Sequence, residues 1–401
     1  MVWSHNHSAH FIANNPPSGQ TPIPPAEKAL IQALTASGTA KTDRRAVWEL
    51  LRAAIPGSAL SLRQVSNVID NTKRARHQAL SSMGGDVAFL LSWLAEEKNK
   101  DARLIYHFQV HQQTGVLQRL FVSSAPMIDA LQQFGDVVIA DVAQGRNVYN
   151  MPLNLFSVVD GAGRTRNVAY VVQDREDQES HEWVLTHLLA TYGNQPRIIV
   201  SDQDAGFSSA VQSILPSSHH ILCIWHIWQN ITKNVKPKLR GKWPKFAEVF
   251  WCVYKAPSPA AFEKRWTAFL QMFPSAEPYL GANQYHTRKS WAAAWVRTKF
   301  TVNVRTTGRV ESENGVNKLL GGRKTTLTDL FKRLLCRADD QLEHSTQACK
   351  SLHKKASPAE RLFQPVVDLM REYCHIGATR HAFKEMEEGV TCEVTDIPVR
   401  A

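Results

Sequence analysis

The segment from Phe134 to Phe156 (FGDVVIADVAQGRNVYNMPLNLF) restricts the possible folds of this chain more than any other. It contains a run of apolar, mostly β-branched residues between Asp136 and Asp141, which predicts a buried central strand that ends in a carboxylate. A buried aspartate is costly unless it is paired, hydrogen-bonded or bound to a metal. Asp141 therefore predicts either a cation site shared with other acids or a simple cap of the next turn, and the segment alone leaves both open.

The composition predicts a folded chain with two or three domains, because 43% of its 401 residues are hydrophobic and 21% are charged. The formal net charge is +11 and is unevenly distributed. Between Ile227 and Val310 there are 15 Lys and Arg residues against three acidic residues, so this segment alone exceeds the net charge of the whole chain. Such a basic segment favours a polyanionic partner.

The six cysteines are scattered, unlike the dense spacing of a secreted disulfide scaffold, and this favours a reducing compartment. The first residues contain neither a basic nor an apolar targeting region, and no apolar run approaches the length of a membrane span. We therefore expect a soluble intracellular protein with no membrane partner.

The N-terminal part divides into a linker and a small helical domain. Residues 1–25 are polar and proline-rich, and His5 and His7 within them could supply half of a zinc site, although no cysteine precedes them. Residues 26–82 predict three short helices that end in a basic cluster at 73–76. These helices suit a helix-turn-helix DNA reader or a plain helical spacer.

The centre of the chain predicts an α/β domain. Residues 83–133 form its lead-in, with a helix over 85–97 and two strands over 104–112 and 116–124. The core at 134–235 is expected to run strand 136–141, strand 151–159, strand 167–172, helix 182–192, strand 197–201, helix 205–215, strand 219–223 and helix 224–235. This order, with acids after two core strands, predicts an RNase H-like mixed sheet. A doubly wound nucleotide-binding domain is the main rival, but no glycine-rich phosphate loop follows any strand.

The segment 236–300 predicts a basic helical insertion into this α/β domain. Five tryptophans fall in it, at 243, 251, 266, 291 and 295, and such spacing is more typical of a helical core than of base-stacking platforms. Residues 301–355 are expected to hold the catalytic helix and C-terminal helices, and 356–401 to form a tail.

Three carboxylates stand out by their positions: Asp141, Asp202 and Glu311. Two-metal cleavage of a phosphodiester requires acidic oxygens that hold both cations, and Mg²⁺ or Mn²⁺ suits oxygen ligands next to phosphate. The long interval between Asp202 and Glu311 is explained by the inserted helices.

Four motifs in order resemble one known family. They are DVAQGRNVYNMPL at Asp141–Leu153, SDQDA at Ser201–Ala205, CIWH at Cys223–His226 and RVESEN at Arg309–Asn314. Together they resemble the motifs of Mutator-like element (MULE) transposases and of the plant far-red-response transcription factors derived from such transposases. The resemblance covers roughly residues 84–350.

The resemblance implies a DDE triad of Asp141, Asp202 and Glu311, with Glu313 as the alternative third acid. It also marks Cys223 and His226 as a CxxH pair, which could be half of a zinc site or could orient the active-site helix. His5 and His7 resemble the closing HxH of a WRKY-like zinc finger. The upstream cysteines and the later SWIM finger of these relatives are absent from the sequence, so we expect a truncated copy.

The expected function is that of a cut-and-paste DNA transposase core acting in the nucleus as a homo-oligomer. Its partners would be double-stranded DNA, both terminal inverted repeats and target DNA. The candidate DNA-binding residues are Arg146, Lys233, Lys236, Lys238, Arg240, Arg309, Lys318, Arg323 and Lys324. A DNA-binding regulator that no longer cuts, and a different RNase H-like nuclease or resolvase, are the alternatives.

Overall fold

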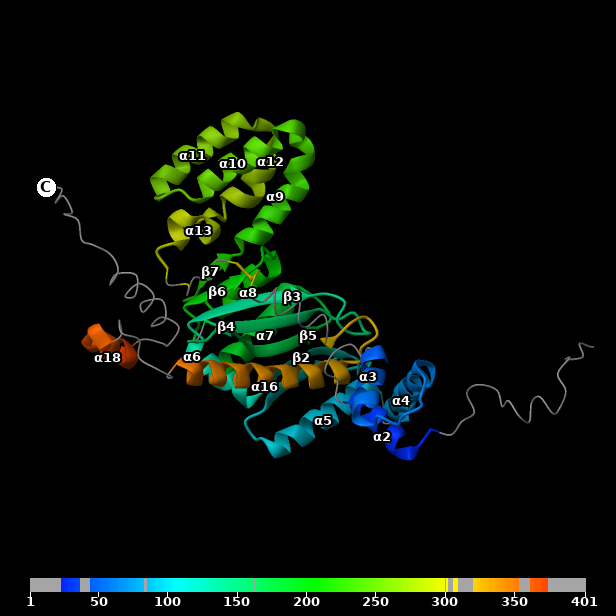
Figure 1. Ribbon diagram of the computed structural model, residues 1–401. Helices are drawn as coiled ribbons and strands as arrows, with labels where there is room; N and C mark the ends of the chain where they lie inside the picture. Colours follow the sequence, from blue (N-terminus) through cyan, green and yellow to red (C-terminus); the bar gives the residue numbers. More distant parts are fainter. Residues whose placement is uncertain are drawn as a thin grey trace, which may run out of the picture.

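A computed structural model of the chain describes residues 23–36, 44–82, 85–161, 163–299, 301, 306–308, 320–352 and 361–373. Its centre is a sheet flanked by helices on both faces, with a group of helices above it and another beside its lower edge (Figure 1). In this part of the chain no helix has both the length and the apolar character needed to cross a membrane.

The sheet is mixed and has seven strands in the order β1-β2-β5-β4-β3-β6-β7. The strands are β1 Ile105–Val110, β2 Leu117–Ser123, β3 Val137–Ala143, β4 Leu153–Val159, β5 Thr165–Gln173, β6 Ile198–Ser201 and β7 His219–Leu222. Each pair of neighbouring strands in the series β1-β2-β5-β4-β3 is antiparallel. Strand β6 is parallel to β3, and β7 is parallel to β6. The predicted strands are thus confirmed, with end shifts of one or two residues.

Alternating residues of the central strands point to opposite faces of the sheet and pack into two hydrophobic layers. On one face, Ile139 and its neighbours pack against α5 (Asp86–Lys100) and α16 (Leu327–Leu352). On the other face, Val138 and its neighbours pack against α7 (Gln178–Tyr192) and α8 (Ala205–Ile214). The continuous apolar run at 137–140 is therefore explained by burial on both faces of the sheet.

Three details differ from the sequence prediction. Helix α6 (Ala125–Phe134) was not predicted, although Pro126 lies in its first turn, where the missing N–H is tolerated. Strand β3 continues to Ala143, so Asp141 lies two residues before the end of the strand. Helix α7 begins four residues earlier than expected, because the carboxylate of Asp177 accepts a hydrogen bond from Ser180 N and caps the helix.

The helices above the sheet share one aromatic core. They are α9 Ile224–Leu239, α10 Trp243–Tyr254, α11 Pro259–Met272, α12 Glu277–Leu280, α13 Arg288–Trp291 and α14 Ala293–Val296, with short turns η1 Arg240–Lys242, η2 Pro274–Ala276 and η3 Gly281–Tyr285. Trp266 and Trp291 are buried in this core, and the other three tryptophans pack against it. The prediction that these tryptophans are core residues is confirmed.

Helices α2 (Pro25–Ala36), α3 (Arg44–Ala54) and α4 (Leu62–Ser82) pack around a hydrophobic cluster of their own. Ser61 and Gln64 form a capping box at the start of α4, since each side chain accepts a hydrogen bond from the backbone N–H of the other. The choice between a DNA reader and a spacer stays a prediction. A further helix, α18 (Gln364–Tyr373), follows α16.

A candidate active site where β3 and β6 end

The parallel pairing of β3 and β6 brings Asp141 and Asp202 to the same level. Ile139 of β3 pairs with Val200 of β6. Asp141 lies two residues after Ile139, and Asp202 lies two residues after Val200. Both side chains line one hollow of about 360 Å³, which includes open solvent at its mouth. The structure thus brings together two of the three predicted acids.

Burial gives Asp202 unusual electrostatics for a carboxylate. Desolvation is the main cause that raises its pKa above the ordinary value, and nearby His226 opposes that rise. Asp141 is only 8% exposed. A buried and a partly buried carboxylate in one hollow would be stabilised by a cation between them, and their hard oxygen atoms fit Mg²⁺ or Mn²⁺.

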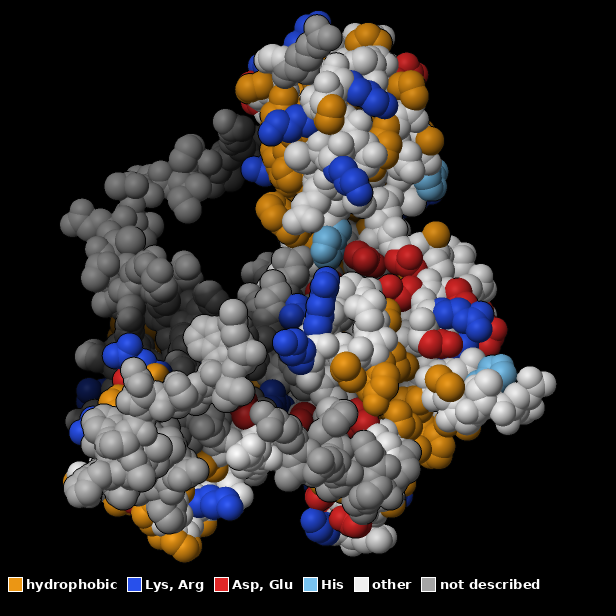
Figure 2. Space-filling view, turned by 90° about the vertical axis from the view of Figure 1, so that its right-hand side faces the viewer, with side chains coloured by type: hydrophobic (Ala, Val, Ile, Leu, Met, Phe, Trp, Pro, Cys, Tyr) orange, Lys and Arg blue, Asp and Glu red, His pale blue; other side chains and the backbone are white. Residues whose placement is uncertain are grey.

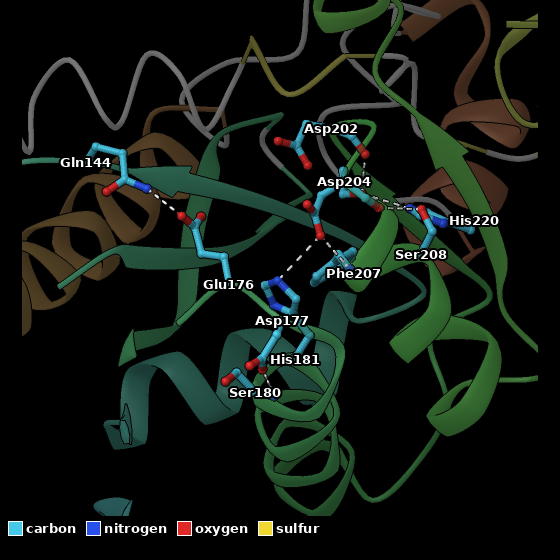
Figure 3. Close-up of polar contacts among 11 residues, drawn as sticks. Gln144, Glu176, Asp177, Ser180, His181, Asp202, Asp204, Phe207, Ser208 and His220 are labelled. Carbon is cyan, nitrogen blue, oxygen red and sulfur yellow. Dashed lines mark hydrogen bonds and ion pairs between the residues drawn. The ribbon is translucent and has the colours of Figure 1, made fainter. Parts of the chain in front are cut away.

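Glu176 also lines the hollow, although it was not among the residues selected from the sequence. It lies in the connection between β5 and α7, and Gln144 Nε2 donates a hydrogen bond to its Oε2 at 2.8 Å (Figure 3). Burial is the first cause that raises the pKa of Glu176, and the charges of Asp204 and Asp202 raise it further. The position of this acidic residue shortly after the end of a strand was the sequence signal that could have identified it.

Asp204 and His181 complete the wall of the hollow. Asp204 follows Asp202 by two residues, and both line the hollow. The Asp204 carboxylate accepts a hydrogen bond from Phe207 N at 2.6 Å and caps α8 (Figure 3). His181 Nε2 lies 3.5 Å from Asp204 Oδ1, and within the described residues neither ring nitrogen makes a hydrogen bond. Burial lowers the pKa of His181, which favours its neutral form.

Cys223 and His226 lie where β7 passes into α9. The Cys223 thiol is fully buried and accepts hydrogen bonds from Thr307 N at 3.3 Å and Thr307 Oγ1 at 3.4 Å. Burial raises the pKa of Cys223, but hydrogen bonds with His226 and Thr307 outweigh it, so the net change is a lowering. The bond to Cys223 raises the pKa of His226 to about 9, with Asp141 and Asp202 contributing. The pair thus contacts the segment that leads towards Glu311.

Four predicted residues, Arg309, Glu311, Glu313 and Lys318, lie outside the described residues. Among the residues that are described, no group of three or more His, Cys, Asp or Glu side chains is arranged to hold a metal ion. The magnesium and zinc predictions therefore stay untested.

The described cationic candidates lie in two places. Lys233, Lys236 and Lys238 are exposed along α9, and Arg240 follows in η1. Arg146, Arg323 and Lys324 lie nearer the carboxylates: Arg146 is in the β3–β4 connection, and Arg323 lies against Gly145. Figure 2 shows Lys and Arg side chains beside a group of acidic ones, at the junction of the sheet with the helices above it.

This fold and site define a mixed α/β protein with an acidic hollow where parallel strands end. Residues 137–230 match the family model of the MULE transposase domain. The chain is 23% identical to FAR1-RELATED SEQUENCE 4 of Arabidopsis thaliana over 324 residues, 78% of this chain and 44% of that protein. It is also 23% identical to FAR-RED IMPAIRED RESPONSE 1 of the same plant, over 67% of this chain and 32% of that protein.

These matches support a relation of this chain to the MULE-related, FAR1-like proteins. It spans less than half the length of these curated relatives. FAR1-RELATED SEQUENCE 5 of Arabidopsis thaliana gives the same result, with 24% identity over 80% of this chain and 40% of that protein.

Proposed function

We propose that this chain is the catalytic core of a DDE-type DNA transposase, which cleaves DNA strands and transfers them during cut-and-paste transposition. The observation that carries this proposal is the meeting of Asp141 and Asp202 in one hollow at the ends of neighbouring parallel strands. The match of residues 137–230 to the MULE transposase domain supports it independently.

We further propose that the sheet is RNase H-like. Three consecutive antiparallel strands, β3 to β5, are followed by β6 and β7 on the other side of β3, both parallel to it. On this proposal residues 134–235 are the catalytic core, 236–300 the basic insertion and 301–355 the return to the core. The helices at 26–82 would be a separate domain.

Asp141, Asp202 and Glu311 would hold the cations, Mg²⁺ or Mn²⁺. When bound, such ions activate the attacking oxygen and stabilise the leaving oxygen of a phosphodiester. The described residues support this by their chemistry: Asp141 and Asp202 offer oxygen ligands, and their burial limits competing hydration. A zinc role for Cys223 and His226 is less well supported than a structural one, because the Cys223 thiol is held by Thr307.

The proposed partner is double-stranded DNA in the nucleus, at transposon ends and at target sites, bound by a homo-oligomer. The exposed lysines of α9 and the cations near Gly145 would contact phosphates, so binding should weaken steeply with salt.

A DNA-binding regulator that no longer cuts is the second candidate. The names of the relatives favour it, because FAR-RED IMPAIRED RESPONSE 1 is named for a light response and not for a nuclease. The retention of Asp141 and Asp202 in one hollow favours the enzyme.

A strand-cleavage assay with Mg²⁺ or Mn²⁺ separates these candidates. The substrate is a duplex that carries the terminal inverted repeat flanking the coding sequence in its genome. We expect nicking at the repeat end and joined products with target DNA, both abolished by Asp141→Asn and Asp202→Asn. Cleavage without joined products would indicate a nuclease or resolvase, and binding without any cleavage would indicate the regulator.

A further inference from the structure

The β3–β4 connection, residues 144–152, is a rigid loop. The buried Asn147 side chain donates from Nδ2 to Met151 O at 2.7 Å and accepts from Met151 N at 3.0 Å. The N–H of Val148 donates to Thr325 O at 2.8 Å, which ties the loop to the turn before α16. These bonds fix the backbone of the loop on both sides of its tip.

The turn before α16 packs directly against this loop. A Cβ atom on Gly321 would lie 2.7 Å from Arg146 O, so the two backbones touch there. The Arg323 side chain lies against Gly145. Within the described residues Arg146 Nε is buried and has no hydrogen-bond partner. Arg146, Arg323 and the exposed Lys324 therefore form a cationic flank along one rigid unit.

The tip of the loop exposes two large apolar side chains. Val148 is 51% exposed and Tyr149 is 49% exposed. Burial of one end of the tyrosine and a hydrogen bond to Asp86 raise the pKa of Tyr149. Asp86 is itself fixed, because its carboxylate accepts from Leu327 N at 2.6 Å and from Thr328 N at 3.1 Å. The Tyr149 ring is thus oriented by the protein while half of the side chain faces solvent.

The base of this loop adjoins the proposed catalytic hollow. Asp141 is two residues before the end of β3, about 7 Å along an extended strand. Gln144, the first loop residue, hydrogen-bonds Glu176, which lines the hollow (Figure 3). A strand held with its phosphodiester at the carboxylates would therefore run past the loop.

We propose that Tyr149 is a stacking platform for an extrahelical nucleobase beside the reacting phosphodiester, with Arg146, Arg323 and Lys324 holding the adjoining phosphates. An oriented aromatic ring with an exposed face binds a base by stacking, and its flanking cations bind the backbone on either side. An acidic peptide would use the cations but would gain little from the ring. This inference rests on the proposed DNA-processing function.

The test measures binding by fluorescence anisotropy in Ca²⁺, so that no cleavage interferes. The probes are one fully paired duplex and the same duplex with a single extrahelical adenine. We expect the wild-type chain to prefer the bulged duplex by roughly tenfold, the scale of one base–aromatic stack. Tyr149→Ala should remove this preference, and Tyr149→Phe should keep it because the ring remains. Phe108→Ala is the matched control, because Phe108 is a similarly exposed aromatic at the far edge of the sheet.

Equal binding of both duplexes by the wild-type chain, together with metal-dependent cleavage of repeat DNA, would overturn this inference and leave the proposed function intact. A preference that survives Tyr149→Ala would also overturn it. Loss of the preference in Phe108→Ala as well would assign the effect to general destabilisation and reject the platform. No binding to either duplex would reject both proposals.

Discussion

At the residue scale, Asp202 is the clearest case of a side chain whose charged form lowers the stability of the folded protein when no cation is bound. Its pKa is raised mainly by burial, so the folded state disfavours the charged form. The sign follows from linkage: a carboxyl whose folded pKa lies above its unfolded one reduces stability once the pH exceeds the unfolded value.

We therefore expect Asp202→Asn to raise the free energy of unfolding at pH 7 without divalent cations. Chemical denaturation measures this. Added Mn²⁺ should stabilise the wild-type chain and leave the variant unchanged. A variant that is less stable than the wild type in the absence of cations would contradict the electrostatic account of this site.

The pKa of Asp177 is shifted in the opposite direction from that of Asp202. Hydrogen bonding to Ser180 is the first cause that lowers its pKa, so the stability it contributes is present above its ordinary value of 3.8 and is lost as the pH falls through the lowered folded value.

Asp177→Ala should cost about 1 kcal/mol at pH 7, typical of an N-cap, and the difference from wild type should shrink as the pH falls below about 4. Urea denaturation across that range measures it. Asp136→Ala is the control, because its ion pair with Arg197 is exposed and should contribute almost nothing. A pH-independent cost for Asp177→Ala would rule out the carboxylate as the cap.

At the scale of elements, the contact between the β3–β4 loop and the turn before α16 can be tested with two adjacent glycines. A Cβ on Gly321 would lie 2.7 Å from both Arg146 O and Leu330 Cδ1, whereas a Cβ on Gly322 meets nothing within 4 Å.

Gly321→Ala should therefore destabilise the protein by roughly 1–3 kcal/mol, the range of overpacking, and Gly322→Ala should be near neutral. Thermal unfolding of both variants gives the comparison. Equal effects would mean that the close approach of the two segments does not exist in solution.

The strands were predictable because their apolar runs are short, β-branched and bounded by turn residues, as at 137–140 and 198–201. Helix α6 was missed because it follows β2 without a break and is as apolar as a strand. Asp141 and Asp202 were selected because each closes or nearly closes a buried strand. Glu176 and His181 were missed because a loop and a helix carry them into the hollow, and only the tertiary fold determines that meeting.

At the scale of the whole molecule, the positive charge is concentrated on the helices above the sheet. Lys233, Lys236 and Lys238 are exposed on α9, and Lys236 lies over the Trp243 ring at 5.8 Å. A polyanion bound along α9 would release about 0.9 counterions for each phosphate neutralised on duplex DNA.

Replacing these three lysines by alanine should reduce the slope of log K against log salt for duplex DNA by about 2.7 in magnitude. Titrations at several salt concentrations measure the slope. Arg103→Ala is the control, because that guanidinium is paired with Asp129. An unchanged slope in the triple variant would remove α9 from the DNA-binding surface.

The central claim is that Asp141 and Asp202 act together on one bound cation. Electron paramagnetic resonance of Mn²⁺ titrated into the chain tests this directly, without requiring the correct DNA sequence. We expect saturable binding by the wild-type chain, and at least tenfold weaker binding by both Asp141→Asn and Asp202→Asn. Undiminished Mn²⁺ binding in either variant would contradict a shared site.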